Sequence, residues 1–279
     1  TIHQPGSLVK QAAGGTQAPI VLAAFATLRS DLGVSVQSNR PTLSMGANGL
    51  TIGVNWDMYN GVVTGTAATV LTAGTSSKLV NMKLINTSTT AGRNALVAGN
   101  AAMVFGSEVI SYRGNAINLG ANNASFFYNY IHDSNQGFTI AVTTQVANLY
   151  GNILAGNVTN GLITTALTTG QLNLINNTIY GAENKLGTCV NLGTGATAVR
   201  MLNNILAGCV TAISHANTQN VGFDDYNAYY NNTTDVTNWV KGSNDSVLNP
   251  TFTSGAQLTG TTATTSGSVL TQSGGDFST

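Results

Sequence analysis

The sequence predicts an all-β solenoid, and three observations lead to this prediction. Short strands that contain Asn recur along the chain with a period of about 24 residues. A second series of apolar strands keeps the same period, and no helical pattern lies between the two series. Charged residues make up only 7% of the chain, against about 25% in an average soluble domain. Because one turn of such a chain cannot bury its apolar side alone, we expect the turns to stack.

The first series places an Asn two residues before a large apolar residue. Successive positions are 23, 25, 27 and 23 residues apart: Asn129, Asn152, Asn177, Asn204 and Asn227. Residues two apart in a strand share a face, so an inward Ile131 predicts an inward Asn129. A buried amide needs partners, which a stacked Asn finds on the next turn, ~4.8 Å away, or in the backbone at a corner. The alternative is that each Asn only marks a turn.

The second series precedes the Asn strands and keeps step with them. It comprises the segments 116–119, 139–142, 189–192 and 212–214. Cys189 lies in this series and Cys209 lies beside a turn, and we interpret both as small packing residues. Two cysteines in 279 residues do not make a disulfide scaffold, so the redox compartment stays open.

The N-terminal segment, residues 1–40, carries a helical pattern. Apolar residues at i, i+4, i+7 and i+11 predict an amphipathic helix over about residues 19–32. These residues are Val21, Phe25, Leu28 and Leu32. A solenoid has an open apolar end, so we expect this helix to cap it. The alternative is that the helix docks onto a partner or another subunit.

The repeats occupy about residues 41–250, and residues 251–279 form a tail rich in Thr, Ser and Gly. About nine turns at ~4.8 Å per turn predict a rod of roughly 40 Å. We expect the tail either to cover the second end of the solenoid or to link it to something outside this chain.

The composition excludes several functional classes. Ten basic and ten acidic residues give a formal net charge of zero, so the chain has no electrostatic footprint for nucleic acid or an anionic membrane surface. The longest apolar run, residues 20–26, is far shorter than the ~18 residues of a membrane span. An apolar content of 42% without net charge also argues against disorder.

Three motifs stand out within the repeats. They are Asn-Asn-Thr-Ile-Tyr-Gly at 176–181, Asn-Asn-Ile-Leu-Ala-Gly at 203–208, and the stretch 225–231 followed by Leu-Asn-Pro-Thr-Phe at 248–252. They resemble the right-handed parallel β-helix repeat family of pectate lyases, polygalacturonases and many phage tailspikes. The resemblance covers roughly residues 41–250 and implies a single-stranded right-handed parallel β-helix, to which the N-terminal segment would add the capping helix. This scaffold carries lyases, hydrolases, adhesins and inert rods, so it says little about chemistry.

One group of residues is a candidate for acid–base chemistry on a sugar. The register gives Glu108 the slot that Tyr130 takes one turn later, with His132 and Asp133 just beyond it and Arg113 in the preceding turn. We therefore expect Glu108, Arg113, His132 and Asp133 on one face, within about 10 Å. Two carboxylates, an imidazole and a guanidinium suffice for a polysaccharide lyase or glycoside hydrolase. The alternative is a surface ion pair.

Two further groups lie near the end of the repeats. Asp224 and Asp225 are adjacent in sequence and either bind a cation or belong to a turn. Aromatic residues gather in the same region, namely Tyr226, Tyr229, Tyr230 and Trp239. They either stack on sugars and anchor protein contacts or fill the last turns of the core. No cofactor and no metal site is predicted.

These observations favour a non-catalytic structural or surface-binding β-helix. The resemblance implies a phage capsid decoration, appendage or fibre component on the virion surface, or another extracellular protein. The expected partners are virion or surface proteins, further copies of the chain and a glycan, without nucleic acid or a membrane span. The alternative is a polysaccharide lyase or glycoside hydrolase that acts on a cell-surface glycan through Glu108 and Asp133.

Overall fold

The computed structural model describes most of the repeat region. Backbone and side chains are described for residues 42–119, 123–140, 146–164, 170–181, 187–193, 198–216, 222–247 and 249, and the backbone also for 20–22, 27–29, 186, 260–261 and 269–270. The predicted tail therefore lies outside the described residues, except for the antiparallel pair β29 (Gly260–Thr261) and β30 (Val269–Leu270).

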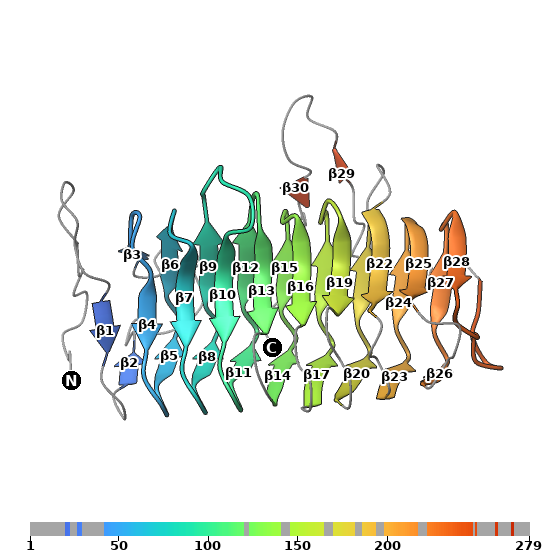
Figure 1. Ribbon diagram of the computed structural model, residues 1–279, viewed down its shortest axis with the longest axis horizontal. Coiled ribbons are helices and arrows are strands. Elements are labelled where there is room, and N and C mark those ends of the chain that lie inside the picture. Colours follow the sequence, from blue (N-terminus) through green and yellow to red (C-terminus); the bar gives the residue numbers. More distant parts are fainter. Residues whose placement is uncertain are drawn as a thin grey trace.

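The chain winds through three parallel sheets, to each of which every turn contributes one strand (Figure 1). Sheet A contains β1 (Ile20–Leu22), β4 (Leu50–Ile52), β7 (Thr69–Ala73), β10 (Asn94–Ala98), β13 (Asn115–Leu119), β16 (Gln136–Ile140), β19 (Asn160–Thr164), β22 (Leu186–Leu192), β25 (Cys209–His215) and β28 (Thr234–Thr237). Sheet B contains β2 (Thr27–Arg29), β5 (Asp57–Tyr59), β8 (Lys78–Val80), β11 (Met103–Phe105), β14 (Ala124–Phe127), β17 (Val146–Tyr150), β20 (Gln171–Ile175), β23 (Ala198–Leu202) and β26 (Phe223–Asp225). Sheet C contains β3 (Thr42–Ser44), β6 (Val62–Gly65), β9 (Lys83–Asn86), β12 (Glu108–Ser111), β15 (Tyr130–His132), β18 (Ile153–Ala155), β21 (Thr178–Tyr180), β24 (Ile205–Ala207) and β27 (Ala228–Tyr230).

Each strand pairs in parallel with the strand at the same place in the next turn. Leu71 of β7, for example, pairs with Leu50 of β4 and with Leu96 of β10. Residues at equivalent positions therefore form columns along the rod, and the predicted fold class, a parallel β-helix, is confirmed. The complete turns between Leu50 and Tyr230 are fewer than the nine expected.

The predicted N-terminal helix over residues 19–32 is wrong where the structure describes this segment. β1 and β2 lie within that range and pair with β4 and β5. An open sheet edge offers unpaired N–H and C=O groups to any extended segment, and this pairing overrides a weak helical pattern. The other residues of the predicted helix lie outside the described part of the chain.

Inward columns of apolar side chains form the core. The column in sheet A is buried throughout and consists of Leu50, Leu71, Leu96, Ile117, Phe138, Leu162, Val190 and Ile213. Phe138 also meets Phe126 of sheet B edge to face, with 4.9 Å between the ring centroids. Such contacts join the sheets across the interior, so that neighbouring turns stabilise one another.

The repeated Asn residues form a buried ladder at the corner between sheets B and C. All five are at most 2% exposed. Asn177 Nδ2 donates to Leu149 O of the preceding turn at 2.8 Å and to Asn204 Oδ1 of the next turn at 3.1 Å. Asn129, Asn152 and Asn204 repeat this pattern. The ladder therefore satisfies the amides with both kinds of partner considered from the sequence, the next Asn and the corner backbone.

The C-terminal end of the ladder is closed by a carboxylate. Asp245 Oδ1 accepts a hydrogen bond from Asn227 N at 2.7 Å, where a further turn would offer an Asn oxygen. A carboxylate has acceptors and no donor, so it ends the ladder without leaving an N–H group unpaired. Tyr229 N also donates to Ser246 O, and Ser246 N donates to Asn227 O. The segment 239–246 thus covers this end of the core.

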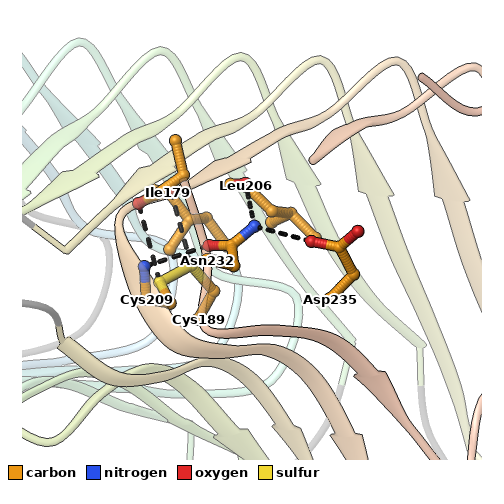
Figure 2. The surroundings of a disulfide bond; sticks show 7 residues. Ile179, Cys189, Leu206, Cys209, Asn232 and Asp235 are labelled. Atoms are coloured by element: carbon orange, nitrogen blue, oxygen red, sulfur yellow. Dashed lines mark hydrogen bonds between the residues drawn. A yellow bond between two sulfur atoms is a disulfide. The ribbon is translucent and has the colours of Figure 1, made fainter. Parts of the chain in front are cut away.

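Cys189 and Cys209 form a disulfide (Figure 2). The two residues lie on the neighbouring strands β22 and β25, with 5.8 Å between their Cα atoms, and both are fully buried. Asn232 lies beside the bond and accepts a hydrogen bond from Cys209 N at 3.0 Å. The interpretation of both cysteines as separate packing residues is therefore wrong, since the fold brings their Cα atoms within bonding distance although the register pairs Cys209 with Leu186.

Candidate functional site

Three of the four predicted catalytic residues lie together on the outer surface of sheet C. Glu108 begins β12 and pairs with Lys83 of β9 on one side and Tyr130 of β15 on the other. His132 ends β15, and Asp133 follows it at a corner. We define Lys83, Glu108, His132 and Asp133 as the polar cluster.

Hydrogen bonds link the polar cluster in a row. Lys83 Nζ lies 2.9 Å from Glu108 Oε1, which in turn lies 3.1 Å from His132 Nε2. His132 Nδ1 lies 3.0 Å from Asp133 Oδ2. Arg113 has an exposed side chain outside this row. The structure therefore brings Glu108, His132 and Asp133 together and supplies Lys83 where the sequence predicted Arg113.

The contacts within the polar cluster favour the charged forms of Glu108 and His132, whose pKa values are both shifted. Burial opposes ionisation of Glu108, but hydrogen bonds from His132 and Lys83 outweigh it and lower the pKa of this carboxyl group. Burial likewise favours a neutral His132, whereas its hydrogen bonds with Asp133 and Glu108 prevail and raise the pKa of the ring. The row thus uses the hydrogen-bonding groups of its members on one another.

This arrangement is poorly suited to acid–base catalysis. Both ring nitrogens of His132 are held by carboxylates, so neither is free to accept a proton from a substrate. A general acid needs a raised pKa, and the pKa of Glu108 is lowered. In the described part of the chain, no group of three His, Cys, Asp or Glu side chains is placed to hold a metal ion.

Asp224 lies inside the last turn, where it holds two of the predicted aromatic residues. Tyr229 Oη and Trp239 Nε1 each donate to Asp224 Oδ2 at 2.8 Å, and Asn227 Nδ2 contacts Asp224 Oδ1. Burial, together with nearby Asp245, raises the pKa of Asp224 to about 7, although the hydrogen bonds from Trp239 and Tyr229 oppose this. Tyr229 and Trp239 therefore belong to the core.

The remaining residues of this group face outward. Asp225 accepts hydrogen bonds from the backbone and side chain of Asn244. It therefore does not hold a cation together with the buried Asp224. Tyr226 is 58% exposed, and Tyr230 is half-buried. The acidic pair thus points to opposite sides of β26, and only part of the aromatic group is available for binding.

A second aromatic group, which sequence reasoning missed, lies on the outer face of sheet B. Phe105, Phe127 and Tyr150 occupy the same outward position in three successive strands, and Tyr128 follows Phe127 at the corner. We call these four residues the aromatic stripe. Phe105 is 43% exposed and Tyr128 is 65% exposed. Phe127 and Tyr150 stack with 5.5 Å between centroids, and Phe105 meets Tyr128 edge to face at 5.7 Å.

Tyr128 adopts an unusual backbone conformation. Its φ angle is 55°, in the left-handed region that favours Gly and Asn. Other turns use Asn or Gly at this corner: Asn60, Asn81, Gly106, Gly151, Asn176 and Asn203. The ring of Tyr128 lies over Gly151, where an added Cβ would come within 2.6 Å of it. A bulky residue here costs about 1 kcal/mol or more, and an exposed ring recovers little of that by burial.

The sequence signal for the aromatic stripe was weak because it depends on the exact register. Phe126, Phe127 and Tyr128 are consecutive, yet one points inward, one outward and one occupies the corner. A shift of one residue would exchange the first two. The signal that could have found the stripe is Tyr128 in a column that contains Asn or Gly in every described turn except this one and that of Tyr226.

Comparison of the chain with protein-family models, with curated proteins and with solved structures finds no match. The architecture, a parallel β-helix, is established by the structure itself. Within its described residues there is no helix long and apolar enough to span a membrane.

Proposed function

We propose that this protein is a non-catalytic, surface-binding β-helix, a rigid rod that presents a binding surface on sheet B. The observation that carries the proposal is the contrast between its two outer surfaces. The polar cluster on sheet C uses its functional groups on one another. The aromatic stripe on sheet B instead leaves large apolar rings in solvent, and such exposed groups mark binding sites.

A place outside the cell, on a virion or another surface assembly, is part of this proposal. A disulfide persists in oxidising compartments and is rare in reducing ones, and Cys189–Cys209 supports such a location. Mass spectrometry of intact extracellular assemblies from the source would test it. Recovery of the chain only from the reducing cytosol would contradict it.

Incubation with acidic and neutral polysaccharides tests the absence of catalysis. We expect no new reducing ends and no unsaturated products from the wild-type protein. Release of oligosaccharides by the wild type, abolished in Asp133→Asn and retained in Arg113→Gln, would establish an enzyme that uses the polar cluster and would overturn the proposal. The Arg113 variant is a matched control because its side chain is exposed and outside the row of contacts.

A further inference from the structure

We propose that the aromatic stripe binds an uncharged polysaccharide, with the sugar chain lying along the rod. This inference rests on the proposed function, since it names the ligand of the surface-binding rod. It is carried by the neighbours of the stripe, the charge of the surface and the backbone of Tyr128.

Amide side chains run beside the aromatic rings on the same face of sheet B. The residues two positions before Phe127, Tyr150 and Ile175 in their strands occupy successive turns. They are Ser125, Asn148 and Asn173. Asn148 Nδ2 donates to Ser125 Oγ at 3.2 Å, and Asn173 Nδ2 donates to Asn148 Oδ1 at 2.7 Å. Asn148 is half-buried and has a second N–H group for a ligand, whereas Asn173 is only 8% exposed and holds Asn148 in place. A sugar ring needs this pairing, because its C–H groups suit an aromatic surface and its hydroxyl groups suit amides.

The two outward columns of sheet B carry no charge over the turns that contain the stripe. One outward column is uncharged from Met103 through Asn173, and the other is uncharged from Val80 through Leu202. Within this band an acidic polysaccharide, a nucleic acid or an anionic lipid would meet no cation, since the nearest charged positions in the first column are Lys78 and Arg200, one at each end. An uncharged ligand would bind there without the free-energy cost of removing a charged group from water.

The size of the surface favours a single extended chain over a protein partner. The stripe, with Ser125 and Asn148 beside it, presents six side chains in a narrow band along three turns. A standard protein interface uses about 20–30 residues on each side. A polysaccharide chain makes a comparably narrow contact, and the stacked rings are already held in place before it binds.

The conformation of Tyr128 indicates that its ring is retained for a ligand. The corner accepts Asn or Gly in neighbouring turns, and Tyr128 replaces them without becoming buried. Strained residues that folding does not require are found at functional sites. Gly151 leaves the space that the ring occupies, which fixes it beside Phe105 and the other rings.

Affinity electrophoresis through gels that contain one polysaccharide each provides the test. The probes are neutral β-glucan, xylan and mannan, with anionic polygalacturonate as the charged arm. We expect at least one neutral polysaccharide to retard the wild-type protein. Tyr128→Asn should bind that polysaccharide about tenfold more weakly. Its melting temperature should equal or exceed that of the wild type, because Asn accepts the left-handed conformation.

Two variants serve as controls. Tyr226→Asn relieves the same type of backbone conformation at the same corner, four turns or ~19 Å along the rod. Tyr112→Ala removes another exposed aromatic side chain, outside sheet B. Both should bind like the wild type.

Three results would overturn the inference. They are failure of all neutral probes to retard the wild type, retardation by polygalacturonate alone, and equal binding by the wild type and Tyr128→Asn. Each would leave the absence of catalysis standing, since that is tested separately by incubation with polysaccharides. Concentration-dependent dimerisation that Tyr128→Asn abolishes would likewise replace the glycan by a second copy of the chain.

Discussion

At the corner between sheets B and C, Asn or Gly takes the left-handed position in most turns, whereas Tyr128 and Tyr226 take it in two. Immediately beside this position, the buried Asn residues repeat a single hydrogen-bonding pattern. The same corner therefore has a regular inner side, which serves the fold, and an irregular outer side, which we assign to binding at Tyr128. This contrast leads to separate tests for stability and for binding.

Replacing one residue of the buried ladder should destabilise the protein strongly. In Asn177→Ala, Leu149 O loses its side-chain donor, Asn152 N loses its acceptor, and Asn152 Nδ2 loses one of its two acceptors. Buried groups without partners cost about 1–3 kcal/mol each, so we expect a loss of roughly 3 kcal/mol in the free energy of unfolding. Urea denaturation measures this loss. The outward Asn148→Ala should change it by about 1 kcal/mol or less, and equal losses would contradict the role of the ladder.

Asp224 should make the C-terminal end of the rod sensitive to pH. Its pKa is raised to about 7 in the folded protein, above the ordinary value of 3.8, so the folded state holds a proton that the unfolded state has lost. The stability from this group is therefore present at low pH and is lost as the pH rises from about 4 through about 7.

Denaturation at pH 5 and pH 8 measures this effect. The free energy of unfolding of the wild type should fall between the two values, and Asp224→Asn should reduce the fall. His132→Gln is the control, because the raised pKa of His132 acts in the same direction. An unchanged pH dependence in Asp224→Asn would assign the effect to other groups.

At the scale of the element, β22 and β25 are joined both by backbone pairing and by the Cys189–Cys209 disulfide. The sequence could place both cysteines near these strands, but it did not predict the bond. The register needed to compare their positions depends on the length of each turn, which varies here between 23 and 27 residues. The N-terminal strands were missed for a related reason, since their pairing with β4 and β5 depends on distant residues.

The disulfide should contribute substantially to stability. It closes a loop with a sequence separation of 20 residues, for which loop entropy predicts about 3 kcal/mol. The double variant Cys189→Ala/Cys209→Ala should lose about that free energy of unfolding in urea. A reductant should then affect the wild type and leave the double variant unchanged. Equal stability of the two proteins without reductant would show that the bond contributes little.

At the scale of the whole molecule, the low charge has a physical reason. Residues at equivalent positions in successive turns lie about 4.8 Å apart, so a charge that recurred in a column would repel its neighbours. Where charges are paired across turns, their signs are opposite, as for Lys83 with Glu108 and Asp57 with Lys78. Repetition made the architecture predictable from sequence, whereas the aromatic stripe departs from the repeat and was found only once the register was known.

Retention on a column of immobilised neutral polysaccharide tests the central claim most directly. We expect the wild-type protein to be retained, Tyr128→Asn to elute much earlier at an unchanged or higher melting temperature, and the polysaccharide to keep its chain length. Identical elution of the two proteins, or shortening of the polysaccharide by the wild type, would contradict this claim.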